Sequence, residues 1–181
     1  EVVSKAKNFS EYFGKDGGIT LSGGEPLLQP EFAYEIFSLC RKDGINTCLD
    51  TSGCILNDKV EQVLSVTDRV LLDIKYTEDE KYRKYVGCGI STVLDFLKYL
   101  DEKEIPTTVR QVIIPTLNDN KENILRLKDI TEKFNYIDKV ELLPFKKLCI
   151  EKYENEFNIV IPGKNIMELD KIITDEEKSI F

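Results

Sequence analysis

The sequence predicts an α/β fold built on a parallel sheet, and three observations lead to it. Strand-like and helix-like segments alternate along the chain of 181 residues, as in βα units joined by right-handed crossovers. There are about five strand-like runs, too few to close an eight-stranded barrel. Most runs carry charge or glycine near their carboxyl end. A curved, open partial barrel and a doubly wound sheet both fit, within a single domain over residues 1–181.

The five predicted strands are short apolar runs. Parallel strands gather an active site at their carboxyl ends, so the polar residues that close these runs should meet in one pocket. The third run is almost continuously apolar, as expected for a strand buried on both faces. The runs cover residues 19–22, 45–49, 70–74, 107–114 and 140–143.

Helices are predicted between the strands where apolar residues recur every three or four positions. Pro30 opens one helix, which is expected to bury four apolar side chains on one face. These are Phe32, Ile36, Leu39 and Cys40. Asn57 or Asp58 is expected to cap the next helix, and Ser91 or Thr92 a later one.

The chain begins with a helical pattern that has no strand before it. Because a helix follows a strand in a βα repeat, we expect a preceding strand upstream of Glu1. The strand over 19–22 would then leave an edge open to pairing. We expect a second copy of the chain, or its own terminal segment, to shield that edge.

The composition excludes several classes of chemistry. There is no histidine, so Ser-His-Asp and Cys-His catalysis and histidine-ligated zinc or non-haem iron are excluded. The net charge of −8 argues against a nucleic-acid partner. No apolar run is long enough to span a membrane and no signal peptide opens the chain, so we expect a cytoplasmic protein without a membrane partner.

The five cysteines do not form a recognisable framework. Their odd number and wide spacing fit neither paired disulfides nor a zinc or iron-sulfur site. We expect reduced thiols in or near the core. They are Cys40, Cys48, Cys54, Cys88 and Cys149.

A glycine pair and an acidic segment close the first two strands. Gly23 and Gly24 allow close approach of a ligand to the backbone, and Glu25 could receive an ammonium group; the alternative is a plain turn. Asp50 and Thr51 offer oxygens that suit a hard cation, the alternative being helix capping.

Charged residues also lie within the next two strands. Asp73 and Lys75 share a strand face and either pair with each other or bind the two charges of a zwitterion. Arg110 could hold a carboxylate or phosphate, or form an ion pair with a neighbouring acidic strand residue. Together these strand ends suit a small amino-acid-like ligand with a cation nearby.

At these residues the chain resembles radical S-adenosylmethionine enzymes, specifically the glycyl-radical-enzyme activases typified by the activating enzyme of pyruvate formate-lyase. The matching segments keep their order and spacing over nearly the whole chain. They are 18–29 (GITLSGGEPLLQ), 47–53 (TCLDTSG), 72–75 (LDIK), 112–115 (VIIP) and 141–145 (ELLPF).

The resemblance implies a partial (β/α)6 barrel and a set of cofactor-binding residues. Gly23, Gly24 and Glu25 would meet the methionyl amine of S-adenosylmethionine. Asp73, Ile74 and Lys75 would meet its amino-acid end, with Arg110 near the cofactor or substrate. Asp50, Thr51 and Asp73 match positions that bind a monovalent cation beside the cofactor carboxylate.

The resemblance also implies a reaction and its partners. A reduced [4Fe-4S] cluster cleaves S-adenosylmethionine, and the resulting 5′-deoxyadenosyl radical removes hydrogen from a backbone glycine of a glycyl radical enzyme such as pyruvate formate-lyase. Flavodoxin or ferredoxin would be the electron donor. The cofactor carries the difficult step, and the protein positions it.

The chain departs from the family in two places. The Cys-x-x-x-Cys-x-x-Cys cluster motif does not occur in the 181 residues, so we expect this chain by itself to be inactive. After the last strand, Lys146 and Cys149 stand where the family often has histidine and glycine. Two other functions stay open: a non-catalytic barrel remnant that binds a ligand or partner, and a related radical enzyme with another substrate.

Overall fold

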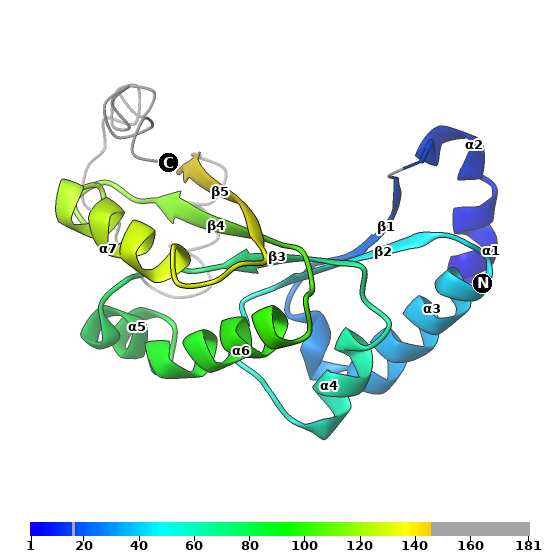
Figure 1. The fold of residues 1–181 in the computed structure, drawn as a ribbon, viewed down its shortest axis with the longest axis horizontal. Helices are drawn as coiled ribbons and strands as arrows, with labels where there is room; N and C mark the ends of the chain where they lie inside the picture. The colour runs from blue at the N-terminus through cyan, green and yellow to red at the C-terminus, as the bar shows by residue number, and fades with distance from the viewer. Residues whose placement is uncertain (16, 146–181) are drawn as a thin grey trace, which may run out of the picture.

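A curved parallel sheet runs through the middle of the molecule (Figure 1). The structure is a computed structural model, and it describes residues 1–15 and 17–145. In this part of the chain the strand order is β1-β2-β3-β4-β5, all neighbours are parallel, and the sheet does not close. The strands are β1 (Gly18–Leu21), β2 (Asn46–Thr51), β3 (Arg69–Asp73), β4 (Thr107–Ile113) and β5 (Ile137–Pro144). The prediction of an open, partial TIM-like barrel is confirmed.

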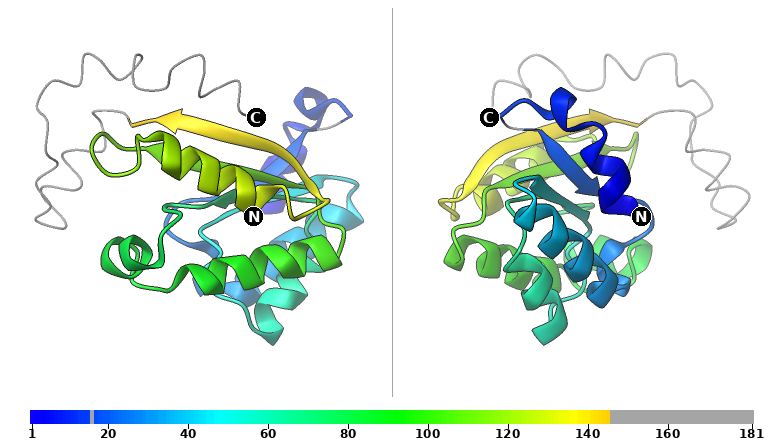
Figure 2. Two further views of the ribbon diagram at one scale, coloured as in Figure 1. Left: turned by 60° about the vertical axis from the view of Figure 1, so that its left-hand side comes forward. Right: turned by 90° about the vertical axis from the view of Figure 1, so that its right-hand side faces the viewer.

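The longer helices lie on one face of the sheet and leave the other face uncovered by helices in the described part of the chain (Figures 1 and 2). None of the described helices is long and apolar enough to cross a membrane. The helices are α1 (Val2–Lys7), α2 (Ser10–Phe13), α3 (Pro30–Lys42), α4 (Asp58–Leu64), α5 (Asp79–Tyr85), α6 (Ile90–Glu102) and α7 (Lys121–Thr131), with a 3-10 turn η1 at Pro26–Leu28.

The hydrophobic core lies between the sheet and these helices. In β3, Val70 and Leu72 are fully buried against the helices, while Leu71 and Asp73 on the opposite face are half-buried. The expectation that this strand is buried on both faces is therefore wrong. One face of the strand contributes to the core, and the other lines the concave side of the sheet, where the charged residues lie.

Two predictions about helix detail are also wrong. Helix α3 begins at Pro30 as expected, but Phe32 and Leu39 on its predicted buried face are 55% and 41% exposed. The buried positions are Ala33, Ile36, Phe37 and Cys40, because the contact with the sheet is rotated around the helix.

Helix α6 begins at Ile90, before the predicted Ser91 or Thr92 cap. Its N-cap is Gly89, and the backbone N–H of Ile90 donates instead to Asp79 at the start of α5. The side chain of Asp79, which belongs to α5, thus replaces a local N-cap side chain. For α4 the prediction is confirmed, since the side chain of Asn57 accepts from the backbone N–H groups of Lys59 and Val60.

The helical pattern at the start of the chain forms two short helices that precede β1, with α1 against α3. Strand β1 pairs with β2, and its outer edge has no other strand beside it in the described residues. The expected shielding of this edge stays a prediction. Lys146 and Cys149 lie outside the described residues.

Candidate functional site

One pocket at the carboxyl ends of β1 to β4 collects nearly all of the predicted site residues. Its volume is about 340 Å³. The register of the parallel strands explains the convergence, because Asp73 lies directly beside Arg110 on the neighbouring strand. The pocket is lined by Ser22, Gly23, Gly24, Glu25, Asp50, Thr51, Ser52, Asp73, Lys75 and Arg110.

A second hollow of about 430 Å³ lies at the opposite end of the sheet. It is formed by the segments that lead into β3 and β4, and Asp68, Lys103 and Pro106 are among its walls. It is larger, but it lacks a cluster of partly buried charges converging on one point. The smaller pocket is therefore the better candidate for a charged ligand.

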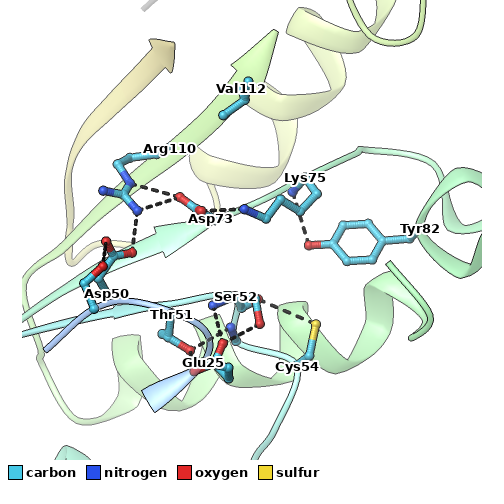
Figure 3. Close-up of polar contacts among 12 residues, drawn as sticks. Glu25, Asp50, Thr51, Ser52, Cys54, Asp73, Lys75, Tyr82, Arg110 and Val112 are labelled. Carbon is cyan, nitrogen blue, oxygen red and sulfur yellow. Dashed lines mark hydrogen bonds and ion pairs between the residues drawn. The ribbon is translucent and has the colours of Figure 1, made fainter. Parts of the chain in front are cut away.

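Arg110 joins the two aspartates of the pocket (Figure 3). Its Nε donates to Oδ1 of Asp73 at 2.9 Å, and its terminal NH2 group bonds both to Asp73 and to Oδ1 of Asp50. Burial by itself would lower the pKa of Arg110, but the charges of Asp73 and Asp50 outweigh it and raise the pKa. The guanidinium therefore stays charged and holds β2, β3 and β4 together at the pocket.

Lys75 completes this charged group. Its Nζ lies 2.5 Å from Oδ2 of Asp73, so Asp73 bonds to two cations at once. The ion pairs considered as alternatives to ligand binding are therefore present. The Lys75 side chain is 37% exposed, about twice as much as that of Arg110 at 18%. Lys75 is thus the cation that can turn more readily to an incoming carboxylate.

Glu25 is anchored by the loop that follows β2. Its Oε1 accepts from the hydroxyl of Thr51 at 2.7 Å, and its Oε2 accepts from the backbone N–H and the hydroxyl of Ser52 at 2.9 and 2.6 Å. Oε1 also accepts from the backbone N–H of Leu27, which caps the turn η1. These bonds place a carboxylate at the rim of the pocket in a fixed orientation.

Three glycines in and beside the pocket are required for different reasons. Gly23 and Gly24 have φ values of 87° and 58°, and an added Cβ at either would meet no atom within 4 Å. They are needed for their backbone conformation, which leaves open space above the turn. At Gly53, an added Cβ would lie 2.7 Å from Cδ1 of Leu72, so this position requires glycine for close packing as well as for its φ of 66°.

Sequence reasoning missed four residues that support the site. Ser22 donates to Oδ2 of Asp50 at 2.9 Å, and Ser52 holds Glu25. Both lie next to predicted site residues, so their position along the chain was a usable signal. The other two are Tyr82, seven positions after Lys75, and Asn118, 43 positions after it.

Tyr82 and Asn118 hold the backbone of Lys75 from both sides. The Tyr82 hydroxyl accepts from the Lys75 N–H at 3.3 Å, and the Asn118 amide donates to the Lys75 carbonyl at 3.3 Å. The same Asn118 side chain bonds to the backbone of Val112 and Ile114 at the end of β4. Both side chains are buried. They meet Lys75 because of the way the chain folds, and neither belongs to a sequence motif that contains Lys75.

Ile74 and the oxygens predicted to bind a cation already make contacts within the protein. The Ile74 side chain is fully buried on the core side of the sheet, and its N–H donates to the Arg110 carbonyl. Asp50 and Asp73 point at Arg110, and Thr51 donates to Glu25. No group of three or more cysteine, aspartate or glutamate side chains gathers around a metal position within residues 1–15 and 17–145. The roles of Ile74 and of the cation stay predictions.

The pocket presents charges of both signs, which would suit a ligand that carries an ammonium group and a carboxylate. A fixed carboxylate at Glu25 and the aspartates offer negative charge, and Lys75 and Arg110 offer positive charge. An iron-sulfur cluster does not fit the described residues, because their cysteines are not gathered into a group of ligands.

The family model of the Radical SAM superfamily matches residues 1–127. The match includes every strand end that lines the pocket. The chain therefore belongs to the radical SAM superfamily, whose name refers to S-adenosylmethionine.

Curated relatives narrow the assignment. The chain is 42% identical over 172 residues to the pyruvate formate-lyase-activating enzyme of Clostridium pasteurianum, with 94% of this chain and 71% of the relative covered. It is 39% identical over 139 residues to pyruvate formate-lyase 1-activating enzyme of Escherichia coli K12, with 76% of this chain and 56% of the relative covered. Within the superfamily, the chain is a member of the pyruvate formate-lyase-activating enzyme family.

Solved structures confirm the fold. A domain of pyruvate-formate lyase-activating enzyme from Bacteroides vulgatus has a TM-score of 0.66 at 23% identity, covering 87% of this chain and 93% of that one. Streptococcus suis SuiB bound to S-adenosylmethionine has a TM-score of 0.64 at 17% identity, covering 97% of this chain and 41% of that one. At 23% and 17% identity, the similarity to these two structures shows a shared fold and nothing more specific.

Proposed function

We propose that the pocket binds the amino-acid end of S-adenosylmethionine, and that the complete protein activates a glycyl radical enzyme such as pyruvate formate-lyase. The observation that carries the proposal is the convergence of Glu25, Asp50, Asp73, Lys75 and Arg110 on one pocket. Family membership supports S-adenosylmethionine as the ligand, and the charges of both signs in the pocket suit an amino-acid-like cation.

Each group in the pocket has a role in this binding mode. Glu25, held by Thr51 and Ser52, and the exposed backbone of the Gly23–Gly24 turn receive the ligand's ammonium group. Lys75 leaves Asp73 to meet the ligand carboxylate. A charge-assisted bond of this kind is about twice as strong as a neutral one.

Arg110 keeps the two aspartates in place while the ligand binds. Asp50 and Asp73 then present negative charge toward the positive sulfur. The ion pairs of the free protein thus hold the binding groups in position before the ligand arrives.

The chemistry comes from groups that bind to this scaffold. When bound, S-adenosylmethionine and a [4Fe-4S] cluster would supply the radical chemistry by which the complete protein activates its partner. The described residues bind and orient the cofactor, and they provide no ligand set for the cluster. Flavodoxin or ferredoxin is the proposed electron donor.

A monovalent cation at Asp50, Thr51 and Asp73 forms part of the proposal. Arg110 bonds to Oδ1 of both aspartates, so the cation would bind their Oδ2 atoms, which contact Ser22 and Lys75 in the free protein. The cation would then share the aspartates with the guanidinium. Ligand affinity in potassium chloride should exceed that in tetramethylammonium chloride at equal ionic strength; equal affinities would remove the cation from the proposal.

A non-catalytic binding module is the second candidate. It is favoured by the mutual pairing of the charges in the pocket. Iron-sulfur reconstitution distinguishes the two. The activase proposal expects no cluster absorbance from this chain and a brown protein from a chain extended upstream. A colourless extended chain would favour the module.

Calorimetric titration of the chain with S-adenosylmethionine tests the binding site directly. Asp73→Asn should weaken binding about tenfold, because it removes the charge that orders both Lys75 and Arg110. Asp95→Asn, which removes the same charge from the exposed side of α6, is the matched control and should bind like the parent. Equal affinity of all three proteins would refute the assignment of the pocket.

A further inference from the structure

Two cysteines from different loops meet beside the candidate site. The Sγ atoms of Cys54 and Cys88 lie 2.8 Å apart, although 34 positions separate them in the sequence. Cys54 follows Gly53 in the loop after β2, and Cys88 lies between Gly87 and Gly89 in the connection from α5 to α6. Both carry free thiols and are half-buried, so a small reagent can reach them.

The other described cysteines provide an internal comparison. Cys40 is fully buried in α3, and Cys48 lies in β2 on the concave side of the sheet. Neither sulfur contacts another cysteine of the described residues, whereas Cys54 and Cys88 are in direct contact. The juxtaposition is thus specific to one pair among the described residues.

The contact lies between the two supports of the pocket. Cys54 donates weakly to the carbonyl of Ser52 at 3.8 Å, and Ser52 anchors Glu25 (Figure 3). Cys88 follows α5, the helix that carries Tyr82, and the Tyr82 hydroxyl holds the backbone of Lys75. A covalent bond between the two sulfurs would join the Glu25 support to the Lys75 support.

We propose that Cys54 and Cys88 form a modification site at which a small disulfide of the glutathione type converts the two thiols into one intramolecular disulfide bond. A disulfide has an S–S length of about 2.05 Å, so the sulfurs need to approach by only about 0.8 Å. The inference goes beyond the proposed function and does not depend on it.

The reaction is an ordinary exchange in two steps. The Cys54 sulfur, after losing its proton, attacks one sulfur of the small disulfide, and one small thiol leaves with a proton. The Cys88 sulfur then loses its proton and displaces the second small thiol from Cys54. In total the two cysteines lose two electrons and two protons, and one small disulfide becomes two thiols.

The environment of Cys88 suits a thiol that reacts in the second step of the exchange. Burial, followed by the hydrogen bond and charge of Cys54, raises the pKa of Cys88 to about 12, against a smaller lowering by Arg83. Cys88 thus keeps its proton while Cys54 attacks. The formation of the mixed disulfide removes the hydrogen bond between Cys54 and Cys88, and with it part of the cause of the raised pKa of Cys88.

Peptide mapping under non-reducing conditions tests the proposal. The full chain carrying Cys149→Ser is incubated in glutathione buffers of increasing oxidised fraction, digested and analysed by mass spectrometry. The Cys54–Cys88 linked peptide should exceed any other linked pair by about tenfold, because the folded chain holds these thiols at high effective concentration. The same chain in urea should lose this preference.

The variant Cys88→Ser tests the second step of the exchange. With Cys88→Ser, Cys54 should keep a single glutathione adduct and form no internal link, and thermal unfolding should show that the variant is folded. Two separate glutathione adducts on the folded parent, without the linked peptide, would overturn the proposal. So would a linked-pair distribution that is the same in buffer and in urea.

Discussion

Asp73 and Arg110 lie side by side in the register of β3 and β4, and the carboxylate of Asp73 receives both the guanidinium of Arg110 and the ammonium of Lys75. One aspartate thus orients the two cations of the candidate site. A ligand that binds here must therefore displace ion pairs that already exist in the free protein. The affinity of the site therefore depends on how well the ligand replaces the Asp73–Lys75 contact.

Arg110→Gln should destabilise the fold as well as weaken ligand binding. The change leaves Asp50 and Asp73, each about one-fifth exposed, without the cation between them. The expected loss in the free energy of unfolding is about 1–3 kcal/mol, measured by urea denaturation. Arg110→Lys, which keeps the charge without the forked geometry, should lose less. Equal losses for the two variants would show that charge has no part in the effect.

Tyr82→Phe removes one hydroxyl that accepts from the Lys75 N–H. Because the site is buried, the unpaired N–H should cost about 1 kcal/mol of unfolding free energy and weaken binding of S-adenosylmethionine a few-fold. Tyr12→Phe, at a side chain that is 84% exposed, is the control and should change neither quantity. A Tyr82→Phe protein with unaltered affinity would remove Tyr82 from the support of the site.

Asn118→Ala should be more costly than Tyr82→Phe. Its buried amide bonds to the backbone of Lys75, Val112 and Ile114, so three polar groups lose their partner together. A loss of about 2–4 kcal/mol is expected in chemical denaturation. Asn8→Ala, at an exposed residue after α1, should change stability by less than about 0.5 kcal/mol. A similar small effect at Asn118 would contradict the bracing role.

A comparison of Gly53→Ala with Gly44→Ala separates the cost of close packing from the cost of the backbone conformation. The new Cβ would lie 2.7 Å from Leu72 and 3.2 Å from Phe96, both in the core, at a φ of 66°. Gly44→Ala has a similar φ of 70° but open space, so it measures the conformational cost alone. We expect Gly44→Ala to cost about 1 kcal/mol and Gly53→Ala about 1–3 kcal/mol more, by thermal or urea unfolding. Equal costs would mean that the core yields without strain.

The pair of Arg69 and Asp138 predicts a modest pH dependence. The hydrogen bond from Arg69 lowers the pKa of Asp138 below its ordinary value, against an opposing effect of burial. The pair therefore stabilises the fold above the unfolded pKa of about 3.9, and the gain is lost as the pH falls through the lower folded pKa.

Because both side chains are more than 40% exposed, the gain should not exceed about 1 kcal/mol. Asp138→Asn should lower the urea midpoint at pH 7 and match the parent near pH 2. A difference that grows toward acid would have the wrong sign for this pair.

The strands of the sheet and the location of the site follow from local sequence patterns. Alternating apolar runs and helical periods require only local information, and in parallel strands the polar residues that follow each run must gather at one edge. Gly23, Glu25, Asp50, Asp73 and Arg110 were predictable for that reason, and all of them line the pocket.

The pairing of the charges, and the side chains that support them, depend on contacts between segments that are distant in the sequence. Arg110 and Asp50 are 60 positions apart, and Asn118 and Lys75 are 43 apart, so their contacts follow from strand register and helix packing. The same cause rotated α3, leaving Phe32 exposed and Phe37 buried. Local patterns specify which residues can be buried or charged, but contacts between distant segments are fixed by the packing of the whole sheet against its helices.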